Sequence, residues 1–338
     1  MRSEGAGGVD GVKVSVLIVT MNPRERLGAC LESLRAKTRV PFEVRIAAHR
    51  CKGEDVAWLR GAYPWVAVVE SDGSARGFAE NNNLAAKGAK GEYLFLLNDD
   101  TVLETDAVDR LAGLLDARPE AGIASPYLLN RDGSVQFCGG VEMTAWTWFL
   151  AEMRWRRIVD MQSPFVGAGG VFETQNAMGA ALMIRRGLWE EVGGLDERYF
   201  FGPEDTALSS TVRERGWKIV VDEGARIYHL QSESLKRNFI PVMLAYQRGC
   251  MIFYGRKGAG AALGVRVLAT ARDAMKLAGW LLKGGGENAA VHRRLWWLML
   301  KTAWSRATPK ELFVRYGAET RAGFVAEKAA GAGAGRKE

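Results

Sequence analysis

The sequence predicts an α/β fold with a mostly parallel central sheet, flanking helices and a helical C-terminal region. Three observations predict it. Short β-branched and apolar runs alternate with helical patterns up to about residue 130. The run Tyr93–Leu97 has no polar alternation, which is typical of a strand buried on both faces within a parallel sheet. From residue 239 onward, the pattern is helical and amphipathic.

Strand and helix patterns follow one another in the order expected of βαβ units. The predicted strands are 14–20, 42–48, 65–69, 93–97 and 123–129, and the predicted helices are 27–34, 55–62, 78–87 and 104–117. Such alternation predicts parallel strands joined by right-handed crossovers.

The pattern becomes irregular after a turn at residues 130–133. Later elements are predicted as a strand at 180–184, helices at 186–192 and 204–215, and strands at 217–221 and 225–229. The long irregular segment 143–175 contains Trp146 and Trp148, and such segments are often functional. Two interpretations stay open for these tryptophans: packing beneath a surface loop, or contact with an acceptor substrate.

The composition is that of a globular protein, with 48% hydrophobic and 25% charged residues. Four cysteines are scattered without a metal-binding spacing, which indicates reduced thiols and a cytoplasmic setting. The first residues do not resemble a signal peptide, and we see no apolar run of membrane-spanning length.

The positive charge is concentrated in the last third of the chain. Residues 235–338 hold 19 Lys and Arg against 6 Asp and Glu, a balance of +13, and the total of +7 leaves −6 for residues 1–234. This split favours a catalytic domain followed by a basic attachment region, facing a membrane surface or nucleic acid. The acidic first part and its carboxylate pairs count against nucleic acid, so we expect no nucleic-acid partner.

A first carboxylate pair, Asp99 and Asp100, directly follows the buried strand. Ligands of open α/β sheets bind beyond the carboxyl ends of the strands, and carboxylates there can hold a hard divalent cation that grips phosphate oxygens. The alternative interpretation is a strand-to-helix turn in which Asp100 or Thr101 caps the next helix.

A second pair, Glu204 and Asp205, follows the aromatic Phe201 and Pro203 at a predicted helix start. Acids favour helix starts, so a capping role is the alternative to catalysis here. His229 ends the last predicted strand, where it is either a site residue or a structural histidine.

The order of these parts resembles the GT-A-fold, family 2 glycosyltransferases, most closely their bacterial rhamnosyltransferase-like branch. The resemblance covers roughly residues 13–235. It rests on an ordered set of short motifs, since a chance match would have to keep both sequence and spacing. The motifs are Ile18-Val19-Thr20, Gly77-Phe78 with Asn82-Asn83, Asn98-Asp99-Asp100-Thr101, Gly179-Ala180, Gly193 to Glu197, Glu204-Asp205, Arg213 to Trp217, and His229.

The resemblance implies an inverting transfer of a sugar from a dTDP- or UDP-sugar, with rhamnose as the best single guess. The acceptor would be a hydroxyl of a glycan or lipid-linked acceptor in cell-surface polysaccharide assembly. Asp100 and His229 would hold Mg²⁺ or Mn²⁺, and Asp205, supported by Glu204, would be the general base. The nucleotide sugar would contact Thr20, Asn22, His49, Arg50, Gly77, Phe78, Asn82, Asn98 and Asp99. The acceptor would contact Trp146, Trp148, Gly179 and Phe201.

The sequence departs from the family pattern in ways that leave the donor nucleotide open. Where relatives carry Asp-Asn-X-Ser after the second strand, with the Asp reading the base, this chain has Ala48 to Cys51. The first motif is Met21-Asn22-Pro23, and Ala207 replaces an acid that often follows the general base. A nucleotidyltransferase and a non-catalytic, glycan-binding relative therefore remain alternatives.

The predicted domains are a flexible tail (1–12), a catalytic domain (13–235), a basic amphipathic helical region (236–328) and a disordered tail (329–338). The catalytic domain would divide into a nucleotide-sugar-binding half (13–125) and an acceptor-binding half (126–235). Within 291–306, tryptophans lie beside cations, which suits a lipid–water interface. The alternative is packing on the catalytic domain or a second subunit in a homodimer. The membrane interpretation places the protein on the inner face of the cell membrane.

Overall fold

The structure, a computed structural model, describes residues 11–317 apart from 22, 23, 25, 72, 137, 155–169, 231–237, 284 and 285. The described chain divides into two compact units. The sheet unit comprises residues up to 142, then 170–197 and 204–230, and the helical unit comprises 143–154, 198–203 and 238–317. Asn22 and the predicted tails, except for residues 11 and 12, lie outside the described residues.

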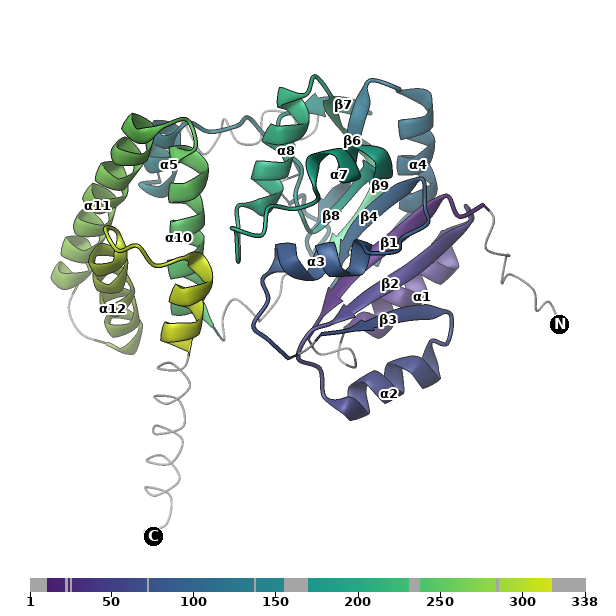
Figure 1. Cartoon of the computed structure of the whole chain (residues 1–338), viewed down its shortest axis with the longest axis horizontal. Helices are drawn as coiled ribbons and strands as arrows, with labels where there is room; N and C mark the ends of the chain where they lie inside the picture. The colour runs from purple at the N-terminus through teal and green to yellow at the C-terminus, as the bar shows by residue number, and fades with distance from the viewer. Residues whose placement is uncertain are drawn as a thin grey trace, which may run out of the picture. The chain divides into compact units, whose positions relative to one another are not determined.

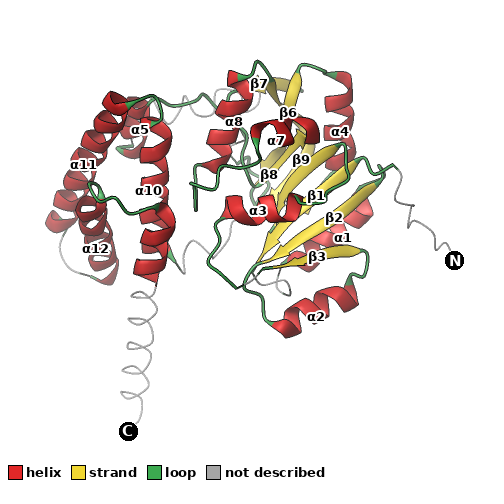
Figure 2. Ribbon diagram, viewed as in Figure 1, coloured by secondary structure: helices red, strands yellow, loops and turns green. Residues whose placement is uncertain are grey.

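The described part of the sheet unit forms a nine-stranded mixed sheet, shown in yellow in Figure 2. The strand order is β3-β2-β1-β4-β8-β6-β9-β5, and β7 also pairs with β9. The strands are β1 (Val14–Thr20), β2 (Phe42–Ala48), β3 (Val66–Glu70), β4 (Tyr93–Asn98), β5 (Thr101–Leu103), β6 (Ala121–Leu129), β7 (Val171–Thr174), β8 (Ala181–Arg185) and β9 (Lys218–His229).

Helices cover both faces of this sheet. They are α1 (Leu27–Lys37), α2 (Gly53–Ala62), α3 (Phe78–Ala86), α4 (Ala107–Ala117), α7 (Arg186–Val192) and α8 (Glu204–Glu214). Alternate residues of β4 explain why: Tyr93, Phe95 and Leu97 join a core with α1 and α4, while Leu94 and Leu96 join one with α3, α7 and α8. Both faces of β4 are therefore buried, as its unbroken apolar run predicts.

Strands β1 to β4 are mutually parallel, so their carboxyl ends lie at one edge of the sheet. β6 also runs parallel to β9, whereas β8 is antiparallel to both β4 and β6. Short strands β5 and β7 each run antiparallel to β9. The predicted α/β class with a mostly parallel sheet and a helical C-terminal part is confirmed.

Three local expectations are corrected by the structure. Thr101 begins strand β5, and α4 starts only at Ala107, so neither Asp100 nor Thr101 caps that helix. The predicted strands 217–221 and 225–229 are one strand, β9, whose pairing with β6 shifts register between Pro126 and Tyr127. The irregular segment 143–175 contains a helix, α5 (Ala145–Glu152), and strand β7.

The helical unit contains α5, α10 (Phe239–Gly255), α11 (Ala259–Leu282) and α12 (Glu287–Thr302), with α11 packing against the other three (Figure 1). Its interior holds an ionic cluster as well as apolar residues. Arg272 lies within 2.7 Å of Asp273 and donates a hydrogen bond to Gln247, and its guanidinium lies over the rings of Trp148 and Trp296. Buried charges persist only where they are paired in this way.

Candidate active site

The first acid pair lies in the turn between β4 and β5, at the edge where the parallel strands end. Asp99 accepts a hydrogen bond of 2.7 Å from the hydroxyl of Thr20, at the end of neighbouring strand β1. Burial raises the pKa of Asp99 to about 6, and the negative charge of Asp100 adds to the effect, although the Thr20 hydrogen bond opposes it. Two neighbouring carboxylates in a dry site repel each other, so a cation at this position would be favoured.

His229 reaches Asp100 through strand pairing. β5 pairs antiparallel with the end of β9, which sets His229 opposite Thr101. The His229 Nε2 atom then lies 3.4 Å from Asp100 Oδ1. Asp100 is 2% exposed, and its other oxygen, Oδ2, is buried without a hydrogen-bond partner among the described residues. A buried carboxylate oxygen in this state is costly unless a ligand completes it.

Gln136 fixes the orientation of the His229 ring. The Gln136 amide nitrogen donates to the carbonyls of Leu129 and His229, so its oxygen Oε1 faces the ring as an acceptor. His229 Nδ1 lies 2.9 Å from that oxygen and must carry the proton that joins them. In the neutral ring, Nε2 is therefore the nitrogen with a lone pair, and it lies 3.4 Å from both Asp100 Oδ1 and the side-chain amide nitrogen of Asn98.

These residues fit a divalent cation. The carboxylate oxygen of Asp100 and the Nε2 atom of a neutral His229 ring, which lie 3.4 Å apart, are both cation ligands. No group of three or more His, Cys, Asp or Glu side chains gathers as a metal site within the described residues. Such a cation would need further oxygen ligands from a diphosphate and water, which is the usual arrangement for magnesium with phosphate substrates.

The second acid pair begins α8 in the same unit. Asp205 Oδ2 accepts a hydrogen bond of 3.0 Å from the backbone N–H of Gly179, and its Oδ1 accepts one from Thr206 N–H. Burial raises the pKa of Asp205 above its ordinary value, and these N–H groups oppose the rise. Glu204 is buried beside it. A carboxylate with a raised pKa is a better proton acceptor than an ordinary surface one.

The two acid sites lie at the same edge of the sheet. Asn98, the last residue of β4, donates its backbone N–H to the carbonyl of Ala180, next to the Gly179 that holds Asp205. A Cβ added at Gly179 would meet both Asp205 and Phe78 at 3.4 Å, so Gly179 lies between these two side chains.

Other predicted donor-site residues also gather at the ends of β1 to β3. His49 donates its backbone N–H to the Thr20 carbonyl, and its ring Nδ1 lies 3.5 Å from the hydroxyl of Ser71. Arg50 is exposed with a left-handed backbone (φ 54°). These residues stand where the base-reading motif of the family would lie.

Gly77 and Asn82 belong to the start of α3, the helix that carries Phe78. The Gly77 N–H donates to Glu80 of the first turn, and the buried Asn82 amide donates to the Phe78 carbonyl. Both residues therefore shape the helix start in the structure, and their predicted contact with a nucleotide sugar stays a prediction.

Three predicted acceptor residues belong to the helical unit. Trp148 is 1% exposed and packs against Tyr254, as the packing interpretation expects. Trp146 is exposed and stacks on Phe149, and Phe201 is also exposed. Their role in acceptor binding stays a prediction.

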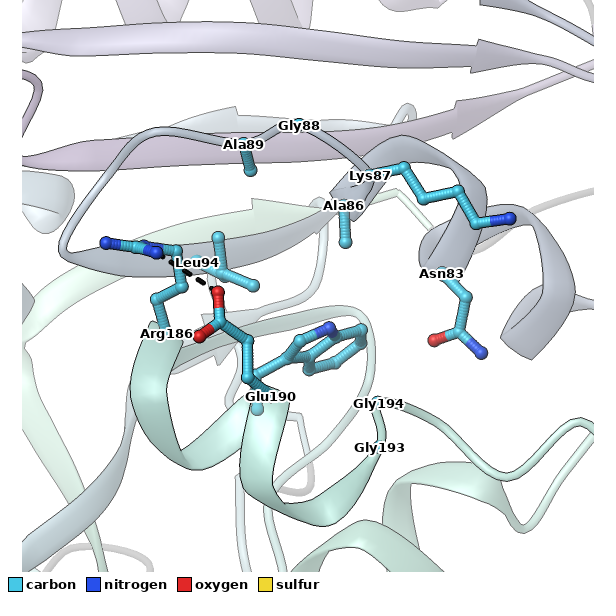
Figure 3. Close-up of a pocket in the computed structure, with 11 residues that line it drawn as sticks. Asn83, Ala86, Lys87, Gly88, Ala89, Leu94, Arg186, Glu190, Gly193 and Gly194 are labelled. Carbon is cyan, nitrogen blue, oxygen red and sulfur yellow. Dashed lines mark hydrogen bonds and ion pairs between the residues drawn. The ribbon is translucent and has the colours of Figure 1, made fainter.

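A separate pocket of about 450 Å³ lies between α3 and α7 (Figure 3). Leu94 lines it, near the amino end of β4, so the pocket is displaced along the strand from the acid pair. Asn83 projects from α3 beside the Gly193-Gly194 turn and exchanges two hydrogen bonds with the backbone of Leu195. Here this asparagine and the glycine turn serve to hold α3 and α7 together.

The raised pKa of Asp99 predicts an unusual pH dependence of stability. The folded state holds this proton up to about pH 6, whereas the unfolded chain releases it near pH 3.8, so folding loses stability as pH rises between these values. With chelator present, Asp99→Asn should raise the free energy of unfolding at pH 7.5 by about 1–3 kcal/mol and make little difference near pH 4. Urea denaturation at both pH values measures this.

Asp132→Asn is the matched control, because hydrogen bonds from Ser134 lower the pKa of that exposed carboxyl. Its removal should stabilise the protein at neither pH. An Asp99→Asn gain that is equal at pH 4 and pH 7.5 would contradict the prediction.

Comparison with known proteins identifies the family. The chain matches the family described as Glycosyltransferase like family 2 over residues 11–241. It is 30% identical over 236 residues to the O-antigen biosynthesis protein RfbC of Myxococcus xanthus, which is 68% of this chain and 18% of that longer protein. It is 25% identical over 270 residues to the N-acetylglucosaminyl-diphospho-decaprenol L-rhamnosyltransferase of Mycobacterium tuberculosis, covering 72% of this chain and 85% of that protein.

Two solved structures share the fold. The mannosyltransferase PcManGT of Pyrobaculum calidifontis, in complex with GDP-Man and Mn²⁺, superposes with a TM-score of 0.54 at 15% identity, covering 88% of this chain and 89% of that one. GalNAc-T7 with UDP, GalNAc and Mn²⁺ gives 0.53 at 14% identity, with coverage of 86% and 55%. The chain thus belongs to glycosyltransferase family 2: it is a glycosyltransferase with the GT-A fold, and it resembles the bacterial rhamnosyltransferase-like branch.

Proposed function

We propose that this chain is a metal-dependent, inverting glycosyltransferase that moves a sugar, best guessed as rhamnose, from a dTDP- or UDP-sugar. The acceptor is a hydroxyl of a glycan or lipid-linked acceptor in cell-surface polysaccharide assembly, on the cytoplasmic side of the membrane. The observation that carries the proposal is the Asp100–His229 pair, with one buried carboxylate oxygen without a partner among the described residues and the imidazole Nε2 3.4 Å from the other. The named rhamnosyltransferase relative supports the choice of sugar and of a lipid-linked acceptor.

Asp100 and His229 would hold Mg²⁺ or Mn²⁺ beside the donor diphosphate. Bound there, the cation would supply positive charge where negative charge develops on the leaving diphosphate. Asp99 and Thr20 position the turn that presents Asp100, and Gln136 keeps the His229 lone pair available. The four free cysteines support the cytoplasmic setting.

Asp205 would accept the proton of the acceptor hydroxyl as its oxygen attacks the anomeric carbon. A single displacement of this kind inverts the configuration at that carbon. The Gly179 N–H holds one carboxylate oxygen of Asp205, which fixes the direction in which the other can accept a proton. Its raised pKa brings the carboxylate closer to the proton affinity that general-base catalysis needs.

Donor class and metal role can be measured together. In a thermal-shift panel of UDP, dTDP and GDP, one nucleotide should raise the melting temperature by several degrees only when Mn²⁺ is present. Asp100→Asn should abolish the metal-dependent shift, because it removes a negatively charged ligand while keeping the side-chain shape. Asp132→Asn, at an exposed turn, should keep it.

A shift with one nucleotide that does not need metal would remove Asp100 as a metal ligand. No shift with any of the three would favour the non-catalytic relative. If nucleoside triphosphates are then added to the panel and they alone give a shift, the nucleotidyltransferase is favoured.

The proton-accepting role of Asp205 predicts a separation of binding from turnover. Asp205→Asn should keep donor affinity within about threefold and reduce kcat by about 10²–10⁴-fold, the usual contribution of a general base. In the wild type, kcat/KM should fall as pH drops through the raised pKa of Asp205. Donor titration and single-turnover transfer measure the two effects, with the surface variant Glu190→Gln as control. Unchanged turnover would remove Asp205 as base.

Gln136 should control metal affinity through the tautomer of His229. Gln136→Leu removes the acceptor for Nδ1–H and should weaken Mn²⁺ binding in the presence of nucleoside diphosphate by about 10–100-fold. Gln136→Glu keeps that acceptor and should bind Mn²⁺ at least as tightly as the wild type, although it loses both hydrogen bonds to carbonyls. Electron paramagnetic resonance of free Mn²⁺ measures this. Equal losses in both variants would mean that Gln136 acts only through folding.

A further inference from the structure

Helix α11 exposes a continuous apolar face, while its charged residues Arg272 and Asp273 are buried alongside Val265 and Ala269. Its exposed residues are all Ala, Gly, Val, Leu or Met, and none of them carries a charge. The large ones, Leu263, Val267, Met275, Leu281 and Leu282, are between 45% and 88% exposed. At about 100° of rotation per residue, these five positions fall within about 120° of one another, so they lie on one side of the helix over about 28 Å. A surface helix normally turns such a face inward.

The charged residues of α11 point into the helical unit and fix this rotation. Arg272 and Asp273 are 2% and 0% exposed and are bound to each other and to Gln247 of α10. Arg266 donates a hydrogen bond of 2.8 Å to the carbonyl of Ala303. Turning the apolar face inward would break these contacts and leave the buried Gln247 side chain without Arg272 and Asp273, which costs free energy. The exposed apolar face is therefore built into the unit.

Aromatic and basic residues border this face. Exposed Trp304 donates its indole N–H to Thr270 of α11, and the Lys283 ammonium lies over Trp280 at the C-terminal end of the helix. Arg256 and Lys257 are exposed just before its first residue. Tryptophan and cations around an apolar face are typical of helices that lie at a lipid–water interface.

The net charge of the helical unit favours an anionic lipid surface over a second copy of the chain as the partner of this face. Residues 239–317 contain 13 Lys and Arg against 3 Asp and Glu, a balance of +10. A second copy would bring two such positive surfaces together, whereas an anionic lipid surface attracts them by about 1 kcal/mol for each nearby cation. Among the described residues, no helix is long and apolar enough to cross a bilayer. A helix that lies in the plane of the lipid–water interface would account for the exposed apolar face and the positive charge, and it needs no membrane-spanning helix.

The sequence predicts lipid contact within residues 291–306, whereas the exposed apolar face belongs to α11. Within 291–306, Leu295, Trp296, Leu298 and Met299 are buried in the helical unit, and Trp297 and Trp304 are exposed. Figure 1 shows α11 along the edge of its helix group.

We propose that the apolar face of α11 docks, parallel to the surface, on a bilayer that contains anionic lipid. The inference adds a surface and a lipid class to the membrane setting proposed above, on which it rests for its location. Its test uses no catalytic activity, so either proposal can fail without the other.

Flotation of the full chain with lipid vesicles tests the docking. The wild type should float with vesicles of phosphatidylcholine containing about one-third phosphatidylglycerol, and much less with phosphatidylcholine alone. The triple variant Leu263→Gln, Val267→Gln, Met275→Gln keeps the net charge and should bind at least tenfold more weakly. Val314→Gln, at an exposed apolar residue outside α11, should bind like the wild type.

Circular dichroism and the metal-dependent nucleotide shift should be unchanged in the triple variant, because its three side chains are exposed in the folded protein. Equal vesicle binding by triple variant and wild type would overturn the proposal, as would a wild type that binds neither kind of vesicle. Analytical ultracentrifugation adds a third outcome: a wild-type dimer that the triple variant loses, without lipid binding, would assign the face to a second copy instead.

Discussion

The pairing of β5 with β9 is the constraint on which the site depends. β5 is only three residues long, yet it is the element that brings residue 229 beside residue 100. The backbone continues this register one residue beyond the two strands, where Leu230 N–H donates to the Asp100 carbonyl. Because a shift of one residue in such a pair turns each side chain to the opposite face, the register leaves His229 a single orientation.

The position of Asp205 also depends on the backbone beside a single strand. Its position is set by a backbone N–H at Gly179, and Gly179 precedes β8, the antiparallel strand that pairs with β4. The acid pair at the end of β4 and the acid at the start of α8 are thus tied through one strand neighbour. Substitutions that disturb the 178–181 connection would affect both parts of the site, even though none of these residues carries a charge.

Much of the sheet unit could be predicted from the sequence because its signals are local. The apolar runs of β1 and β4 and the acids that follow β4 lie next to each other in the chain, and parallel strands must end at one edge. The partner of Asp100 was available only through the family resemblance, since 129 residues separate it from His229. Gln136 could not be found, because a lone glutamine after an irregular turn has no periodic or motif signal.

The helical unit shows a different limit. Periodicity divides α11 into two faces, but it does not say which face is outward, and the usual assumption places polar residues in water. Here the partners of Arg272 and Asp273 come from other elements, so only the packed structure shows that these two charges are buried and that an apolar face is exposed. Trp148 illustrates the same point: its indole completes the packing around that arginine.

The buried ionic cluster has a consequence for how the protein would respond to its medium. At moderate ionic strength, dissolved ions largely screen the attraction between exposed charges more than about 10 Å apart, whereas buried ion pairs are screened much less. Raising the salt concentration would therefore weaken the attraction of Arg256, Lys257 and Lys283 to an anionic surface, while α11 would keep its orientation within the helical unit. Retention on a cell envelope fraction would then decline gradually with salt and persist in part, in contrast to the complete release expected of a purely electrostatic contact.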